Sequence, residues 1–150
     1  MELTNTIPNV KPGQSLYIGR PHSRDWREAL KDHWEVMAGG APKSVWVVPE
    51  WTFKKGDILV TYMQTRPSMV VFVDRFTEDA AEWQDYIPSD TLALFKHGIP
   101  LGVVAEHTGI DLSQRFKLDE SEARAVLKVL RREHKADVGV FGDSRMADLI

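Results

Sequence analysis

Three runs of apolar and β-branched residues in the middle of the chain constrain its fold most strongly. They lie at Ser44 to Val48, Ile58 to Met63 and Met69 to Phe76, and each has the length of a strand. The turn residues beside them are Pro49, Lys55-Gly56-Asp57 and Arg66-Pro67-Ser68. Because the runs are nearly continuous in apolar residues, the sequence predicts strands buried on both faces or closed into a small barrel.

A strand and an amphipathic helix are predicted ahead of these runs. Leu16-Tyr17-Ile18 is a short strand, and Ser23 can cap a helix that ends at Gly39-Gly40. Apolar side chains recur along that helix at helical spacing, so Trp26 and Trp34 are interpreted as core residues.

Shorter elements are predicted after the third run. Tyr86-Ile87-Pro88 can pair as a further strand, and a short helix is expected from 89 or 90 through Phe95. Leu101 to Val104 is apolar but of undetermined type. Ser113 to Lys117 alternates polar and apolar residues, as a strand or an extended loop does.

The last predicted helix has the clearest start signal. Asp119 is its expected N-cap and Glu122 completes a capping box, ahead of a buried stripe that includes Val126 and Leu130. The outer face of this helix is basic, with Arg124, Lys128, Arg131, Arg132 and Lys135. Basic residues late in a helix also favour the helix dipole, so part of this pattern is structural.

The size and composition predict one globular α+β domain. A chain of 150 residues is long enough for one core and too short for two. Residues 1–14 are expected to be a flexible arm, 15–142 the domain, and 143–150 a tail. The absence of cysteine fits a reducing compartment, so a cytoplasmic protein is the default expectation, and no segment reads as a membrane span. A net charge of −3 argues against a protein that grips long nucleic acid by bulk electrostatics.

No motif for catalysis is present in the sequence. The five histidines include no pair at helical spacing and there are no cysteines, so a zinc site has weak support. Asp57 lies just before one predicted strand, and Asp74 lies within another. A metal-dependent nuclease needs a second carboxylate and usually a lysine two residues on, which Asp74-Arg75-Phe76 does not supply. Asp57 follows a glycine in a turn, where aspartate usually accepts hydrogen bonds from nearby backbone N–H groups.

Tryptophans near loops are the positive signal for binding. Trp46 lies in the first run, Trp51 lies in the loop after it, and Trp83 lies in an acidic segment as a lid or as a wall of a site. Aromatic side chains that stack on an unstacked or flipped nucleobase form the usual pocket for such a base. For any one of these tryptophans, packing in the core is the competing interpretation.

Three segments carry a family resemblance. They are Trp51 to Tyr62, where a Lys-x-Gly-Asp turn leads into a strand that ends at a tyrosine; Lys43-Ser44-Val45-Trp46; and Ser113 to Leu130 with its Val-x-Val-Phe-Gly-Asp tail. The first resembles a segment of EVE domains, and the other two resemble the methyl-base cage strand and the end of YTH domains. EVE and YTH domains both belong to the PUA-like superfamily. Together with the order of the predicted elements, these segments make the chain similar to that superfamily over about residues 15 to 142.

The resemblance implies a small PUA-like β-barrel of about six strands flanked by two or three main helices. It implies a non-catalytic reader, without a cofactor, of a modified, in particular methylated, base that is flipped or single-stranded in DNA or RNA. Such domains often serve as the specificity module of a modification-dependent restriction or defence system, with the nuclease in a partner.

The resemblance also implies site residues. The base-binding pocket would comprise Trp46, Trp51, Trp83, Tyr17, Arg20, His22 and Val47. Trp46 takes the cage position, and the opposing wall is either Trp51 or Trp83. The phosphate-binding residues would be Gln114, Arg115, Lys117 and Arg124.

Two alternatives come from other functional classes. One is a small metal-dependent nuclease or RNA-processing enzyme that uses Asp57, Asp74 and a histidine as acid–base groups. The other is a protein-interaction module that binds its partner through the Trp83 loop.

Overall fold

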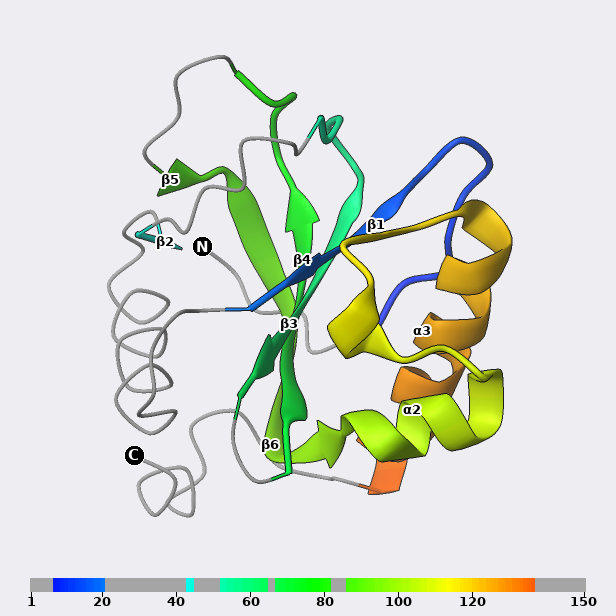
Figure 1. The fold of residues 1–150 in the computed structure, drawn as a ribbon. Helices are drawn as coiled ribbons and strands as arrows, with labels where there is room; N and C mark the ends of the chain where they lie inside the picture. The colour runs from blue at the N-terminus through cyan, green and yellow to red at the C-terminus, as the bar shows by residue number, and fades with distance from the viewer. Residues whose placement is uncertain (1–6, 21–42, 45–51, 65–66, 82–85, 137–150) are drawn as a thin grey trace.

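The computed structural model describes residues 7–20, 43–44, 52–64, 67–81 and 86–136, which form an α+β structure (Figure 1). Its elements, in chain order, are β1 (Leu16–Gly19), β2 (Lys43–Ser44), β3 (Ile58–Met63), β4 (Met69–Phe76), β5 (Tyr86–Ile87), β6 (Ser89–Pro100), α2 (Leu101–Thr108), the 3₁₀ turn η1 (Leu112–Gln114), β7 (Lys117–Leu118) and α3 (Glu120–Ala136).

The centre of the structure is a mixed five-stranded sheet in the order β6-β4-β3-β1-β7. β1 and β3 are parallel, and the other neighbours are antiparallel. β2 and β5 form a separate antiparallel pair. In the described part of the chain no pairing joins β6 to β7, so the five-stranded sheet is open and not closed into a barrel.

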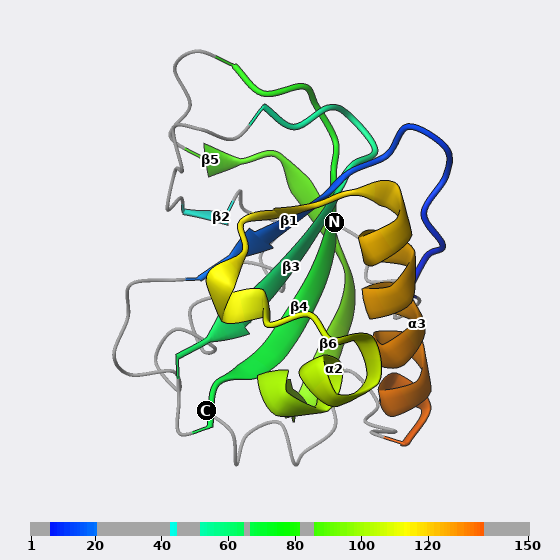
Figure 2. The same ribbon diagram turned by 45° about the vertical axis from the view of Figure 1, so that its right-hand side comes forward.

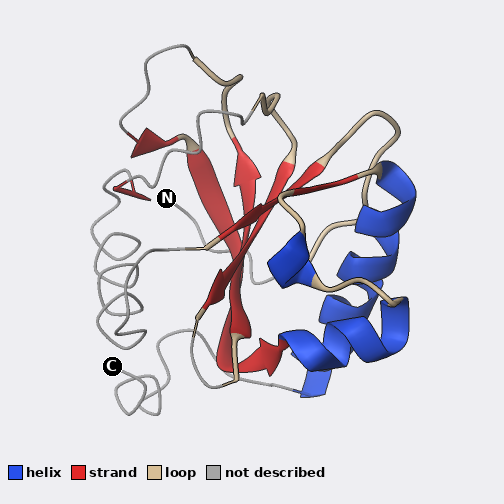
Figure 3. Ribbon diagram, in the orientation of Figure 1, coloured by secondary structure: helices blue, strands red, loops and turns tan. Residues whose placement is uncertain are grey.

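Both helices cover the same face of the sheet (Figures 2 and 3). Leu16, Ile18 and Val60 point to this face and form one buried cluster with Val126 and Leu130 of α3. Side chains alternate between the faces of a strand, so Tyr17 and Leu59, which pair in register, point to the other face. They form a second buried cluster with the aromatic rings of Phe53 and Phe76.

Several predicted elements are confirmed. The predicted runs Ile58–Met63 and Met69–Phe76 are strands with the predicted bounds, and the first strand extends one residue beyond its prediction to Gly19. Tyr86–Ile87 pairs as a strand, as expected. Only Ser44 of the predicted Ser44-to-Val48 strand is described, and it lies in β2.

The helix predicted through Phe95 is wrong, because residues 89–100 form the long strand β6. β6 pairs with β4 along its length, from Phe76↔Ser89 to Met69↔Pro100. Leu92, Ala93 and Phe95 are buried in this sheet, so pairing and burial outweigh the local cap signal of Ser89 and Asp90. The undetermined segment after it is the helix α2, which ends where Gly109 takes a left-handed conformation at φ 73°.

The capping box of α3 is confirmed. The Glu122 N–H donates to Asp119 Oδ1 at 2.8 Å, and the Asp119 N–H donates to Glu122 Oε1 at 3.2 Å. The apolar stripe of α3 is buried as predicted, with Ala123, Val126, Leu127 and Leu130 each 0% exposed.

Ile7 and Val10, which lie in the segment expected to be a flexible arm, pack in the core. Ile7 and Val10 are buried in the cluster under the helices, and Arg131 Nη1 donates to the Pro8 carbonyl at 2.9 Å. The apolar side chains of Ile7 and Val10 supply the burial that fixes this segment.

The predicted helix that begins after Ser23 and ends at Gly39-Gly40 lies outside the described residues.

Candidate nucleic-acid interface

Tyr17, predicted in the base pocket, lies in an aromatic cluster on the sheet face away from the helices. Its ring meets Phe53 and Phe76 edge-on, with centroids 6.4 and 6.0 Å away, while Phe53 and Phe76 stack at 3.8 Å. Tyr17 is only 2% exposed, so its ring supports this face from below instead of presenting a free stacking surface. The Lys117 ammonium lies 5.4 Å from the centre of the Tyr17 ring, within the range of a cation–π contact.

Arg20, a second predicted pocket residue, follows β1 and is exposed. Its Nη1 donates to the Ser113 carbonyl at 3.3 Å. Arg20 also lies beside the Tyr62 hydroxyl. Burial raises the pKa of Tyr62, whereas the charge of Arg20 and its hydrogen bond to Tyr62 lower it. The end of β1 is therefore joined to the segment that carries the predicted phosphate-binding residues.

That segment is held in place by its own backbone contacts. Asp111 Oδ1 accepts the Ser113 N–H at 3.0 Å and the Ser113 hydroxyl at 2.6 Å, which lowers the pKa of the Asp111 carboxyl. The Ile18 N–H donates to the Phe116 carbonyl at 3.0 Å, just beyond the β1–β7 pairing. The predicted strand or extended loop is thus a 3₁₀ turn followed by the two-residue strand β7.

Arg115 is engaged within the protein. Its Nη1 and Nη2 donate to Glu122 Oε2 and Oε1 at 2.5 and 2.7 Å, and Nη2 also approaches the Lys117 carbonyl at 3.3 Å. The hydrogen bond to Glu122 raises the pKa of Arg115, and the same contact, with the Asp119 N–H, lowers the pKa of Glu122 to about 2. A bidentate pair of this kind neutralises much of the Arg115 charge.

Three side chains of the segment are exposed: Gln114, Phe116 and Lys117. Phe116 is 59% exposed and is the only exposed large hydrophobic residue in the described part of the chain. Phe116 is not among the site residues predicted from the sequence. The sequence pattern that indicates Phe116 is an aromatic residue between two cations, which is typical of single-strand binding surfaces.

Arg124, the fourth predicted phosphate-binding residue, lies one turn into α3. Its Nη2 is 3.6 Å from Glu120 Oε2, an exposed (i, i+4) pair worth little stability. Glu120 also accepts the Gly13 N–H at 3.1 Å. Arg124 therefore faces a carboxylate, unlike Lys117.

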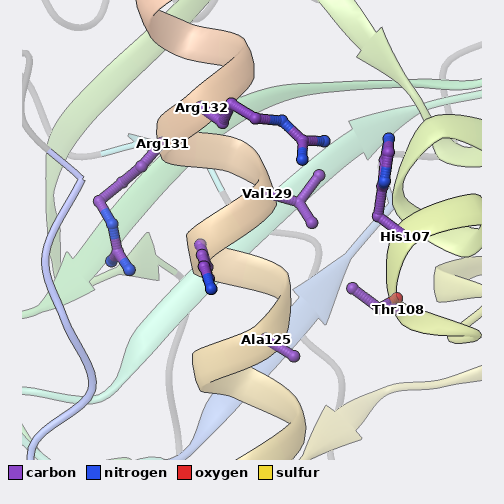
Figure 4. Close-up of a pocket in the computed structure, with 7 residues that line it drawn as sticks. His107, Thr108, Ala125, Val129, Arg131 and Arg132 are labelled. Carbon is purple, nitrogen blue, oxygen red and sulfur yellow. The ribbon is translucent and has the colours of Figure 1, made fainter.

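A groove between α2 and α3 is a second basic feature (Figure 4). It has a volume of about 720 Å³ and is lined by His107, Thr108, Ala125, Lys128, Val129, Arg131 and Arg132. The basic face of the last helix was predicted from the sequence, whereas His107, which the fold places opposite it, was not.

The remaining predicted pocket residues lie outside the described residues: His22, Trp46, Val47, Trp51 and Trp83. The structure thus brings Arg20 together with the 113–117 segment, and Tyr17 together with Lys117, but it does not place the predicted tryptophans.

The carboxylates considered for catalysis make structural hydrogen bonds. Asp57 is 5% exposed, and its two oxygens accept the Ser15 and Lys54 N–H groups at 3.0 and 2.9 Å, as its turn position predicts. Asp74 accepts the Thr91 hydroxyl at 2.6 Å. Within the described ranges no three His, Asp or Glu side chains cluster so as to hold a metal ion. The helices of those ranges are too short or too polar to cross a membrane.

Comparison of the chain with protein-family models, with curated proteins and with solved structures finds no match in any of the three.

Proposed function

We propose that this protein is a non-catalytic reader of a modified, in particular methylated, base in DNA or RNA, and that it is a PUA-like domain. The observation that carries the proposal is the position of Phe116. Its ring is exposed between Arg115 and Lys117, on a backbone that is hydrogen-bonded to β1 beside Tyr17 and Arg20.

This arrangement supports contact with a single strand or a flipped base for two reasons. An exposed aromatic ring offers a stacking face to any base, and stacking is worth about 1–3 kcal/mol per base. Lys117 and Gln114, next to it, are exposed and supply a cation and an amide for the phosphates. The β1–β7 pairing holds the segment, so little conformational entropy is lost on binding.

In the proposal, the modified base itself enters a pocket that has Trp46 as one wall. Trp51 or Trp83 forms the other wall, Val47 and His22 line the pocket, and Arg20 approaches it from the end of β1. Burying one added methyl group stabilises the complex by about 0.8 kcal/mol, so selectivity requires a closely fitting cage. A nuclease in a partner chain would supply cleavage where the reader serves a restriction system.

The enzymatic alternative has no support in the described residues. Both oxygens of Asp57 accept backbone N–H groups, which is a structural use of that carboxylate.

The test is fluorescence-anisotropy binding of the purified chain to short oligonucleotides of DNA and RNA, single- and double-stranded. Each oligonucleotide carries one of several methylated bases or none. The proposal expects tighter binding to one modified base than to its unmodified counterpart. Equal affinity for all oligonucleotides, or no binding, contradicts it, and metal-dependent cleavage would favour the enzyme.

A further inference from the structure

The groove between α2 and α3 gathers basic side chains from two helices. His107 lies in the last turn of α2, and Lys128, Arg131 and Arg132 lie in the second half of α3. Arg132 and His107 extend toward each other across the groove, with Val129 between them (Figure 4). No carboxylate is among the lining residues.

Two of these groups have contacts and two do not. Arg131 Nη1 donates to the Pro8 carbonyl, and Arg132 Nη2 lies 3.3 Å from Glu133 Oε1 in an exposed pair. Lys128 and His107 are exposed, and their side chains make no hydrogen bond or ion pair with any described residue. Basic side chains therefore line a concave surface in a protein whose net charge is −3, and two of them have no counter-charge there.

The helix dipole does not explain why these basic side chains share one groove. A helix C-terminus favours cations only within its last turn, whereas Lys128 lies in the middle of α3. Because His107 belongs to the other helix, the groove exists only through the packing of α2 on α3.

We propose that this groove binds the phosphate groups of the same nucleic-acid strand that meets Phe116. The inference rests on the proposed function and extends its binding path along α3. The helix begins at the Arg115–Glu122 contact, and Lys128 and Arg132 follow Glu122 by six and ten residues. At a rise of 1.5 Å per residue this is about 9–15 Å, or about three to four steps of a stacked strand.

The binding experiment uses fluorescein-labelled, unmodified single-stranded oligonucleotides of about 4 and 12 nucleotides, in DNA and RNA. The variants are Lys128→Gln, Arg132→Gln and the double variant. Lys55→Gln is the control, since it removes an exposed lysine that does not line the groove. Circular dichroism confirms that each variant is folded.

The groove variants should weaken binding of the long oligonucleotide about threefold to tenfold and leave the short one unchanged. The slope of log affinity against log salt should fall by about 0.7 for each phosphate contact removed. Equal affinities of wild type and groove variants for the long oligonucleotide would contradict phosphate binding by the groove. They would not contradict the proposed reader function. A wild type that binds none of the methylated or unmodified oligonucleotides would overturn the reader itself.

Free phosphate is a second source of the same anionic chemistry. Titration with inorganic phosphate at constant ionic strength, followed by the amide shifts of His107 and Lys128, distinguishes it from the strand. Weak, unsaturated shifts agree with a strand-binding groove. Saturation by phosphate alone, with no effect of oligonucleotide length, would overturn the assignment to a strand.

Discussion

Arg115 and Glu122 form a bidentate ion pair, with nitrogen–oxygen distances of 2.5 and 2.7 Å, that joins the segment before β7 to the first turn of α3. Glu122 also belongs to the capping box with Asp119. One carboxylate thus caps the helix and fixes the segment that presents Phe116. Arg115, which was predicted to bind phosphate, thus helps to support the surface that presents Phe116.

Removing this carboxylate should change the pH dependence of stability. In the folded protein the pKa of Glu122 is lowered from 4.5 to about 2. The contribution of its carboxylate to the stability of the folded state is therefore fully present above about pH 4.5. That contribution is lost as the pH falls toward 2, because protonation breaks the pair. Glu122→Gln should therefore melt below wild type at pH 6, and the difference should shrink between pH 4.5 and pH 2.5. Thermal denaturation at a series of pH values measures this, and a difference independent of pH would contradict the role of the pair.

Gly98 should not tolerate a side chain. Its φ is 75°, and a Cβ there would lie 2.9 Å from the Met69 Cβ. The left-handed conformation costs about 1–2 kcal/mol for alanine, and the forced contact adds about 1–3 kcal/mol. Gly98→Ala should lower the free energy of unfolding in urea by about 2–5 kcal/mol. The matched control is Gly102→Ala, an exposed position in α2 with nothing within 4 Å, which should gain about 0.5–1 kcal/mol. Equal effects at both positions would refute the argument.

Asp57 should matter for stability and not for binding. Asp57→Ala leaves the Ser15 and Lys54 N–H groups without their acceptor, which should cost about 2–3 kcal/mol of unfolding free energy. Asp79→Ala is the control, because this exposed aspartate accepts one exposed N–H, from Lys55, and should cost less than about 1 kcal/mol. Oligonucleotide affinity at a temperature where the variant is folded should equal that of wild type, and a large loss of affinity would assign Asp57 a functional role.

Phe116 should contribute to binding and not to stability. Phe116→Ala should weaken oligonucleotide binding by about 1–3 kcal/mol, for modified and unmodified bases alike, because stacking does not depend on the modification. Its unfolding free energy should stay within about 0.5 kcal/mol of wild type, since the ring is 59% exposed. Phe116→Tyr keeps a stacking face and should restore binding. An alanine variant with wild-type affinity would remove Phe116 from the interface.

Trp46 should govern selectivity. Trp46→Ala should cost about 1–3 kcal/mol for the modified oligonucleotide and less for the unmodified one, because the cage wall contacts only the inserted base. Anisotropy titrations of both oligonucleotides measure the difference. A folded variant with unchanged selectivity would rule out Trp46 as the cage wall.

Local signals predicted several elements correctly. The bounds of β3 and β4 followed from uninterrupted apolar runs between turn residues. The start of α3 followed from Asp119 and Glu122, which are three residues apart and need no other part of the chain to form a capping box. The structural use of Asp57 likewise followed from its turn.

β6 shows where local signals fail. Ser89 and Asp90 are good helix caps, yet their segment is a strand, because the free edge of β4 binds it along its length. Ile7 and Val10 were missed as core residues for a similar reason, since their burial depends on the sheet and helices that follow them in the chain.

Local sequence patterns specify which segments of β3, β4 and α3 take regular structure, because turns, caps and periodicity act between residues a few positions apart. Tertiary packing selects which charges and rings are available for binding. It pairs Arg115 with Glu122, buries Tyr17 against the stacked rings of Phe53 and Phe76, and leaves Phe116 exposed. A charge or ring is available for binding only where no distant residue neutralises or buries it. Which distant residues lie close to it is fixed by packing alone.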